Sequence, residues 1–278
     1  MKVAPFLAQI LLAASATAIP LAAKQQHARA QSAVTSPVAN DTRVIGTARY
    51  SATEKKYDGY GWSGASHENM PFGSKFTGVG ARFKIPEISV PAENEKDYEA
   101  GLLITVGIDG RTHGDLMLSA GIHSQITVDG RSDFYAYYEW LPGHYSPEIY
   151  EFNVQPGDEV QISIETTSPI SATIIYENVS TGQIVSRDVA PADPSTSALA
   201  GADALWIVHN YIDLVGEVPP ARFNKVTFTD TWAELEGGQR VGASGATLIN
   251  TLPNHGRLVT TPKVVSDKKV EIVYNGPK

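Results

Sequence analysis

Three runs of the chain combine ionisable side chains with the alternating pattern of β-strands. The runs are 105–109, 134–140 and 205–209, and residues two apart on a strand point to the same side. One side of these runs carries Asp109, Glu139 and His209. Carboxylates and an imidazole on one sheet face can serve as acid, base or hydrogen-bonding groups, so this face is the candidate site.

Each of these residues also has an ordinary structural explanation when it is taken alone. Alternating tyrosines, such as Tyr135 and Tyr137, are typical of a half-buried sheet surface. An aspartate before a glycine, as at Asp109, usually forms a turn. A single histidine is usually solvated or packed in a core. The prediction therefore depends on the three ionisable groups sharing one face.

The elements that must position these groups are predicted to be strands almost throughout. From about residue 47 onward the chain shows apolar alternation or short apolar runs bounded by turn residues. The runs that we interpret as strands include 79–85, 102–108, 160–166, 171–176 and 226–228, with a last strand pair at 241–250 and 264–274.

Turn signals and the absence of a helical period indicate the fold class. Asp129-Gly130 and Thr181-Gly182 are hairpin-type turns between apolar, β-branched runs. Such signals recur about every ten residues, which favours a sandwich or barrel over alternating strands and helices. We predict an all-β, two-sheet antiparallel β-sandwich formed by one domain, residues 47–278.

Several segments, taken in order and spacing, resemble the eqolisins, the fungal glutamic-peptidase family. The resemblance covers roughly residues 60–230 and implies a β-sandwich of the concanavalin-like jelly-roll type with a concave acidic groove. In that family a glutamate activates water as general base, and a glutamine amide stabilises the oxyanion. The segments that carry the resemblance are Gly61-Trp62-Ser63-Gly64-Ala65, Val106-Gly107-Ile108-Asp109-Gly110, Phe134 to Pro142, Pro156 to Gln161, Tyr176-Glu177-Asn178 with Thr181-Gly182-Gln183, and Ala221 to Asp230.

When this chain is aligned with the family on those motifs, it carries other residues at both positions that are catalytic in the family. The glutamine position falls on Ser119 and the glutamate position on His209. The family pattern is kept at Trp62, Asp109 and Glu139. It is changed at Thr105, where the family has tryptophan, and at Tyr135, His123 and Leu205, where it has acids. The resemblance thus implies a groove that is aromatic, apolar and lined by histidine, in which peptidolysis at low pH is not expected because His209 would be protonated there.

The first functional hypothesis is an enzyme that acts on a small apolar molecule. The substrate would lie against Trp62, Thr105, Asp109, His123, Tyr135, Tyr137, Glu139, Leu205 and Ile207. His209 and Ser119 would form hydrogen bonds with a carbonyl or hydroxyl, with His209 acting as a general acid or polarising the carbonyl. The chain is also similar in outline to fungal hetero-Diels–Alderases of tropolone–sesquiterpenoid biosynthesis, which implies a cycloaddition.

Two alternative functions remain open from the sequence. One is a secreted hydrolase, either with a relay of Ser119, His209 and an acid or with Gln125 and Glu217 as the family pair in a shifted register. The sequence around Ser119 lacks the Gly-x-Ser-x-Gly elbow that such a serine usually occupies. The other alternative is a non-catalytic β-sandwich that binds carbohydrate or another ligand.

The composition narrows the range of partners. The 278 residues carry a formal net charge of −8 and contain no cysteine. We see no basic patch, so no nucleic acid is expected as a partner. We also see no nucleotide-binding glycine loop or metal-ligand spacing, and therefore predict no cofactor and no metal. The oligomeric state is left open.

The N-terminal region is interpreted as a targeting segment. Lys2, an apolar core at 6–14 and the small residues Ala16-Thr17-Ala18 are typical of a secretory signal peptide over residues 1–18. The run is too short and weak for a membrane anchor, which needs roughly 20 apolar residues. Residues 19–46 are predicted to be a disordered leader or pro-segment. We expect a protein secreted or held in the secretory lumen, glycosylated at the sequons of Asn40 and Asn178.

Overall fold

The computed structural model describes residues 56–59, 61–68, 73–91, 99–127, 129–143, 148–210, 218–251 and 259–276. The predicted signal peptide, the predicted leader and Asn40 lie outside these residues, as does Glu217. The described strands all belong to one compact unit. None of the described residues forms a helix long and apolar enough to cross a membrane.

The residues that the structure describes form sixteen strands. They are β1 (Lys56–Gly59), β2 (Trp62–Glu68), β3 (Phe76–Lys84), β4 (Ala100–Asp109), β5 (Met117–Ile126), β6 (Ser132–Leu141), β7 (Glu148–Ile149), β8 (Glu159–Ser168), β9 (Ser171–Asn178), β10 (Gln183–Val189), β11 (Asp203–His209), β12 (Lys225–Leu235), β13 (Arg240–Val241), β14 (Thr247–Thr251), β15 (Thr260–Ser266) and β16 (Lys269–Tyr274).

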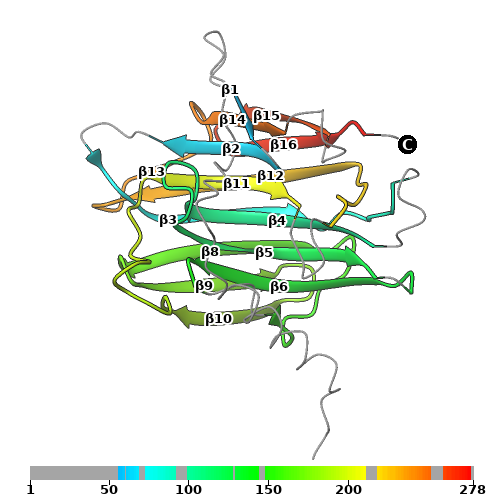
Figure 1. The fold of residues 1–278 in the computed structure, drawn as a ribbon, viewed down its shortest axis with the longest axis horizontal. Helices are drawn as coiled ribbons and strands as arrows, with labels where there is room; N and C mark the ends of the chain where they lie inside the picture. Colours follow the sequence, from blue (N-terminus) through cyan, green and yellow to red (C-terminus); the bar gives the residue numbers. More distant parts are fainter. Residues whose placement is uncertain are drawn as a thin grey trace, which may run out of the picture. The chain divides into compact units, whose positions relative to one another are not determined.

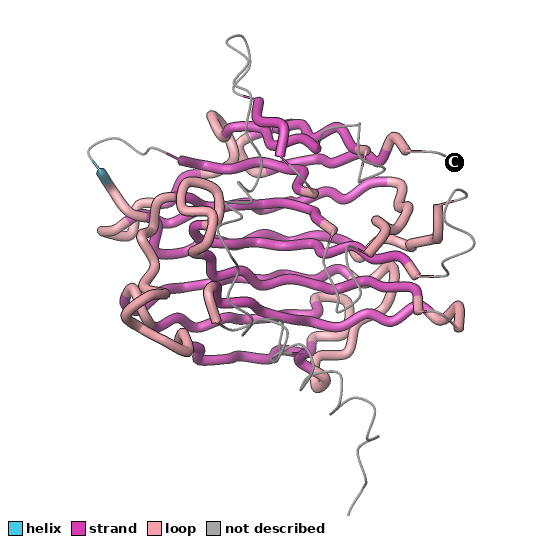
Figure 2. Tube along the Cα trace, in the orientation of Figure 1, coloured by secondary structure: helices cyan, strands magenta, loops and turns pink. Residues whose placement is uncertain are grey.

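The strands form two sheets, which we call sheet A and sheet B (Figure 1). Sheet A has the order β1-β14-β2-β11-β4-β5-β6-β7, and sheet B has the order β10-β9-β8-β3-β12-β16-β15 with β13 beside β12. All neighbours are antiparallel except β1 and β14. Strands joined by loops and turns account for nearly all of the described chain in Figure 2. The predicted two-sheet antiparallel fold is confirmed.

The main core lies between the sheets and follows from the alternation along the strands. β9 alternates strictly between half-buried and buried positions, as a strand with one face on the core should. Trp140 and Trp206, both fully buried, donate their indole N–H groups to backbone carbonyls at 2.8 and 3.1 Å. Burying side chains of this size stabilises the fold by about 2–3 kcal/mol each, and the hydrogen bonds remove the cost of burying their N–H groups.

Some strand predictions need correction at the C-terminal end of the chain. The predicted strand 241–250 is divided between β13 in sheet B and β14 in sheet A, because the segment turns at Gly245, whose φ is 82°. The predicted strand 264–274 is in fact part of a hairpin, with β15 and β16 joined near Asp267. The predicted pairing of 241–250 with 264–274 is therefore wrong.

The two predicted hairpin turns are confirmed. Asp129-Gly130 joins β5 to β6, and Thr181-Gly182 joins β9 to β10. Gly130 and Gly182 have φ of 80° and 76°, a region that glycine adopts at little cost. The Asp129-Gly130 turn fixes the register of β5 and β6, on which Ser119 and Glu139 lie.

Candidate active site

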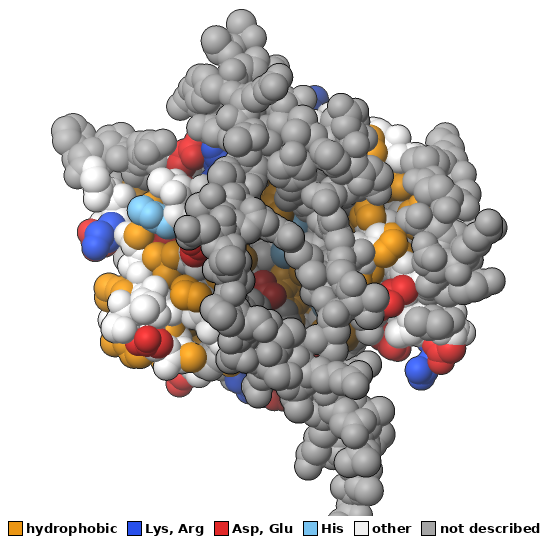
Figure 3. All heavy atoms as spheres, in the orientation of Figure 1, with side chains coloured by type: hydrophobic (Ala, Val, Ile, Leu, Met, Phe, Trp, Pro, Cys, Tyr) orange, Lys and Arg blue, Asp and Glu red, His pale blue; other side chains and the backbone are white. Residues whose placement is uncertain are grey.

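The candidate residues lie in rows across the outer face of sheet A, the face opposite the main core. Cross-strand partners point to the same side, so the pairing registers show which side chains share a row. The three rows run Trp62, His209, Leu103, His123, Tyr135; then Ile207, Thr105, Gly121, Tyr137; then Leu205, Gly107, Ser119, Glu139. The registers place Glu139 and His209, two of the three ionisable groups expected on one face, on the same side of sheet A; the third, Asp109, lies at the end of β4. Figure 3 shows one face of the molecule, with hydrophobic side chains interspersed with acidic and histidine side chains.

A chain of hydrogen bonds connects the first two rows. The Thr105 Oγ1 lies 3.0 Å from the His209 Nε2 and 2.5 Å from the Tyr137 hydroxyl. The His209 Nδ1 lies 3.0 Å from the backbone carbonyl oxygen of Asn210. Thr105, Tyr137 and His209 are buried, with His209 5% exposed. We call Ser119, Tyr137, Thr105 and His209 the hydroxyl–imidazole chain.

Gly121 makes this chain sterically feasible. It lies between Thr105 and Tyr137 in the second row, and the Tyr137 ring crosses it to reach Thr105 two strands away. A Cβ on Gly121 would lie 2.9 Å from the Tyr137 ring and 2.2 Å from the carbonyl oxygen of Ile104. Any side chain at this position would displace the tyrosine, so a glycine here determines where the phenol hydroxyl sits.

Ser119 stands at the other end of the chain. Its side chain is fully buried, and its Oγ has no hydrogen-bond partner of good geometry in the described part of the protein. Burial raises the pKa of Tyr137 well above its usual value, the Glu139 carboxylate adds to the rise, and the hydroxyls of Thr105 and Ser119 oppose it. Ser119 thus lies beside Tyr137, and it meets His209 through Tyr137 and Thr105 instead of directly.

Both histidines of the face are held in the neutral form. Burial lowers the pKa of His209 to about 4, although the bond to the Asn210 carbonyl works in the opposite direction. Burial lowers the pKa of His123 to about 3, and the nearby His209 imidazole adds to the effect. At neutral pH His209 therefore has no proton to give as an imidazolium, which removes the general-acid role considered from the sequence.

Aromatic rings flank the two histidines. The His123 Nδ1 is hydrogen-bonded to the Tyr135 hydroxyl, and the two ring centroids lie 4.6 Å apart. The Trp62 and His209 ring centroids lie 5.9 Å apart. The acids that the family resemblance places at positions 123 and 135 are thus replaced by a mutually bonded, uncharged pair.

An apolar cluster extends the face beside the hydroxyl–imidazole chain. Leu205 and Ile207 pack with Met117 and Ile249, and Trp62 and Leu141 lie against them. Sequence reasoning missed Met117 and Ile249. Met117 has the same strand parity as Ser119 and could have been found from it, whereas the strand that carries Ile249 was assigned incorrectly.

Asp109 has a different environment from the rest of the face. Its carboxylate accepts hydrogen bonds from the backbone N–H groups of Ala200, Gly201 and Ala202 at 2.7–3.0 Å. Its φ of 62° turns the chain at the end of β4. Three N–H donors occupy most of its acceptor capacity, so in this geometry Asp109 fixes the segment that leads into β11 and the His209 strand.

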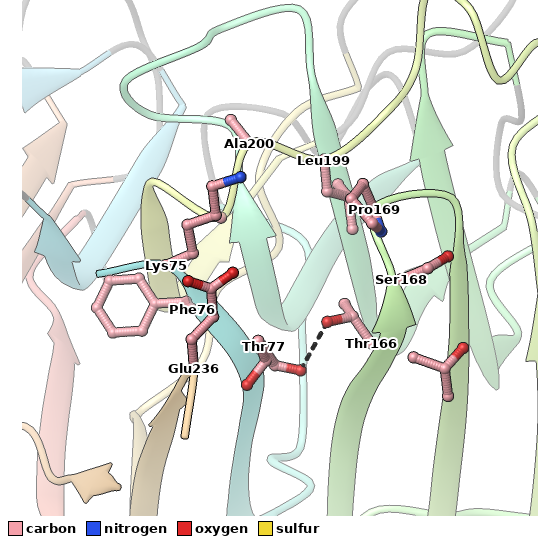
Figure 4. A pocket seen from close by; sticks show the side chains of 11 residues that line it. Lys75, Phe76, Thr77, Thr166, Ser168, Pro169, Leu199, Ala200 and Glu236 are labelled. Atoms are coloured by element: carbon pink, nitrogen blue, oxygen red, sulfur yellow. Dashed lines mark hydrogen bonds between the residues drawn. The ribbon is translucent and has the colours of Figure 1, made fainter. Parts of the chain in front are cut away.

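A cavity of about 330 Å³ lies elsewhere, at the ends of β3 and β8 beside the segment that Asp109 fixes (Figure 4). Its lining includes Lys75, Glu236 and the hydroxyls of Thr77 and Thr166, and the Thr166 Oγ1 donates to the Thr77 carbonyl at 3.0 Å. None of the predicted site residues lines it. No group of three or more metal-ligating side chains occurs among the residues that the structure describes.

The sequon asparagine at the end of β9 is tightly packed. Asn178 is fully buried, and its Nδ2 donates to the Asn153 carbonyl at 3.0 Å and to the Asp158 carboxylate at 2.9 Å. A glycan would replace one Nδ2 hydrogen and would need space beside it. This geometry argues against the predicted glycan at Asn178.

Comparison with known proteins agrees with the two-sheet architecture and the retained motifs. Over 99% of its length the chain is 27% identical to Aspergillopepsin-2 of Aspergillus niger, all of which is covered. It is 29% identical to Scytalidopepsin B of Scytalidium lignicola over 70% of each protein.

Solved structures give the same result. The crystal structure of scytalido-glutamic peptidase with a peptide-based transition state analogue matches 78% of this chain and 98% of its own, with a TM-score of 0.63 and 28% identity. Aspergilloglutamic peptidase from Aspergillus niger matches 63% of this chain and 99% of its own, with a TM-score of 0.57 and 31% identity. The Peptidase A4 family model matches residues 60–274, and the chain belongs to the Peptidase A4 family.

Proposed function

We propose that this family member does not hydrolyse peptides and instead promotes a reaction of a small apolar molecule on the outer face of sheet A. The concrete form is an intermolecular hetero-Diels–Alder cyclisation in fungal tropolone–sesquiterpenoid metabolism. The observation that carries the proposal is the hydroxyl–imidazole chain, in which the groups at the family's two catalytic positions, Ser119 and His209, are joined through Thr105 and Tyr137. Secretion belongs to the same proposal and is supported by the signal-like residues 1–18.

The geometry of His209 disfavours the family's hydrolytic step. A general base needs a lone pair directed at a water molecule that attacks the substrate. Both ring nitrogens of His209 already have partners, Thr105 on one side and the Asn210 carbonyl on the other. No carboxylate lies in the row of His209, and the hydroxyl at Ser119 is a weaker oxyanion donor than an amide N–H pair.

The same face suits an apolar ligand. Leu205, Ile207, Met117 and Ile249 form a buried apolar cluster beside a short row of neutral hydroxyl groups. Binding sites for small organic molecules commonly combine apolar side chains with a few polar groups that orient the ligand. The side chains of this cluster and of the hydroxyl row carry no positive charge or N–H group that would stabilise the negatively charged oxyanion formed during peptide hydrolysis.

A cycloaddition requires little more than orientation from the protein. A hydroxymethyl tropolone that loses water gives an o-quinone methide, whose carbonyl oxygen and methylene carbon add across an alkene of humulenol. Both new bonds form in one step, so no base or cofactor takes part in that step. Holding two partners in contact can supply about 7–11 kcal/mol of the barrier, and a hydrogen bond to the carbonyl oxygen of the heterodiene lowers it further.

The test is incubation of the purified protein with a hydroxymethyl tropolone and humulenol, followed by chromatography with mass detection. We expect a higher rate and an altered ratio of cyclised adducts relative to a protein-free control. Thr105→Val replaces the central hydroxyl of the chain with a methyl group and keeps the branched shape of the side chain, and should lower the rate or selectivity. A product ratio equal to the protein-free control for the wild-type protein refutes the proposal.

An acid peptidase of the family type is the second candidate, favoured by the peptidase relatives and by the retained Glu139. A casein digestion assay at acidic pH decides it. Gln125 has the same strand parity as Ser119 and lies in the row of Asp133, four residues beyond the row of Tyr137 along β5. Robust cleavage that is lost in Gln125→Ala would show that the family's catalytic glutamine lies at 125 instead of 119.

A further inference from the structure

The cavity at the ends of β3 and β8 has walls that are tied to one another by backbone hydrogen bonds. The Leu199 N–H donates to the Pro169 carbonyl oxygen at 2.7 Å, and the Glu236 N–H donates to the Lys75 carbonyl oxygen at 2.9 Å. The residues that follow Leu199 along the wall are held by the Asp109 carboxylate through their N–H groups. Because these walls are fixed before a ligand arrives, the cavity is preorganised, which lowers the entropy cost of binding.

Two opposite charges line this cavity without neutralising each other. Lys75 and Glu236 are both exposed, and neither forms an ion pair with another residue that the structure describes. In the view of Figure 4 both side chains lie on one side of the cavity, and Leu199 and Pro169 lie on the other. A small ligand with a charge of one sign would be attracted by one of these groups and repelled by the other, so the pair favours a ligand that carries both signs.

The threonine hydroxyls that line the cavity offer acceptor atoms to a ligand. The Thr166 Oγ1 donates to the Thr77 carbonyl oxygen at 3.0 Å, and the Thr77 Oγ1 donates to the Glu234 carbonyl oxygen at 3.4 Å. The Thr167 Oγ1 donates to the Ser171 carbonyl oxygen at 3.3 Å. A hydroxyl has a single proton, so each of these groups has only lone pairs left for a ligand. An ammonium group, which donates several N–H bonds, matches these acceptors and the carboxylate beside them.

We propose that this cavity binds a free α-amino acid with an apolar side chain, whose carboxylate meets Lys75 and whose ammonium group meets Glu236 and the threonine hydroxyls. The apolar side chain packs against Phe76, Pro169 and Leu199, which also line the cavity. The volume of about 330 Å³ is at the small end of the range for ligand pockets and suits a single amino acid better than a longer peptide. The site shares no residue with the face proposed for cyclisation, so the two proposals hold or fail independently.

Ligands that share one side chain separate the two charges. L-leucine carries both charges, L-leucinamide lacks the carboxylate, and N-acetyl-L-leucine lacks the ammonium group. Binding to the purified, nitrogen-labelled protein at pH 7 is followed by the backbone amide NMR signals of residues 199–201, which lie in the cavity wall. We expect L-leucine to shift these signals saturably. Each analogue should bind about tenfold more weakly, which corresponds to the loss of roughly one charge-assisted hydrogen bond.

Two substitutions assign each charge of the ligand to its partner. Lys75→Met should weaken the binding of L-leucine and N-acetyl-L-leucine about tenfold and should not weaken that of L-leucinamide. Glu236→Gln should weaken the binding of L-leucine and L-leucinamide about tenfold and should not weaken that of N-acetyl-L-leucine. The matched controls are Lys84→Met and Glu159→Gln, which remove the same charges from the paired far ends of β3 and β8. Both controls should bind all of these ligands like the wild type.

The variants should keep the wild-type midpoint of urea unfolding, since none of the substituted side chains is buried. The proposal is overturned if L-leucine gives no saturable shifts in the wild type, or if Lys75→Met weakens L-leucinamide binding as much as L-leucine binding. Equal weakening by Lys84→Met would also overturn it, because a general loss of positive charge would then explain the effect. Equal binding of L-leucine and both analogues would overturn it as well, because the ligand would then be recognised by its side chain alone.

Discussion

Acid should destabilise this protein through its buried histidines. The pKa of His209 in the folded protein is about 4 and that of His123 is about 3, below the value of about 6.5 for an unfolded chain. The unfolded state therefore binds more protons than the folded state over this range. The stabilisation from keeping both rings neutral is complete above about pH 6.5 and is lost as the pH falls toward 4 and 3.

The magnitude follows from the same values. While a histidine ring stays neutral in the folded protein, the free energy of unfolding falls by about 1.36 kcal/mol per ring for every pH unit below 6.5. At pH 5 the fall amounts to about 2 kcal/mol per ring. The two rings together remove about 4 kcal/mol, a large part of the 5–15 kcal/mol typical of a folded domain. His67, whose pKa is lowered by burial, adds to the loss, whereas Asp203, whose pKa is raised by burial, opposes it.

The assay is urea unfolding followed by tryptophan fluorescence at pH 7.5 and pH 5, in the wild type and in His209→Gln. We expect the wild-type free energy of unfolding to fall by about 4 kcal/mol between the two pH values, and the fall to shrink by about 2 kcal/mol in the variant. His113, exposed on the loop between β4 and β5, supplies the control variant His113→Gln, which should behave like the wild type. A wild-type free energy that changes by less than about 1 kcal/mol would refute the reasoning.

Three further predictions concern other parts of the fold. Gly121→Ala should lower the free energy of urea unfolding by about 2–3 kcal/mol, because its Cβ would lie 2.2 Å from the Ile104 carbonyl oxygen. Gly107→Ala is the control and should cost clearly less, because the nearest atom to its Cβ would lie 3.3 Å away. Equal losses of free energy in the two variants would contradict this explanation. Asp109→Asn should cost about 2 kcal/mol in the same assay, since a neutral amide cannot accept all three N–H groups as strongly, and an unchanged midpoint would count against that role. Peptide mapping of protein produced through a fungal secretory pathway should find Asn178 unmodified, and a glycopeptide at that position would show that its buried hydrogen bonds are broken.

The shared face of the site could be predicted because strand alternation is a local property. Parity groups Glu139 with Tyr137 on β6, Thr105 with Gly107 on β4, and His209 with Ile207 on β11, and the strand pairing then brings these groups to one side of the sheet. The turn residues Gly130 and Gly182 likewise allow their hairpins to be predicted from the sequence. Recurring turn signals favoured a sandwich or barrel, from which we predicted one β-sandwich domain, and the family motifs imply the same two-sheet architecture.

The connections within the face could not be predicted. Which residues share a row depends on strand pairing, and β11 pairs with β4, about 100 residues away in the sequence, and with β2, about 140 residues away. The contact between Tyr137 and Thr105 depends on Gly121, whose role is visible only once three strands are aligned. Ile249 was missed for the same reason, since its strand crosses to sheet A after a turn at Gly245.

The most direct test of the central claim gives one preparation of the purified protein both substrates. Casein at acidic pH measures peptide hydrolysis, and a hydroxymethyl tropolone with humulenol measures cyclisation against a protein-free control. We predict no casein cleavage above background, together with a faster reaction and a changed ratio of cyclised adducts. Casein cleavage with adducts in the protein-free ratio would contradict this prediction, because a face built from Ser119, Tyr137, Thr105 and His209 would then be a working peptidase site.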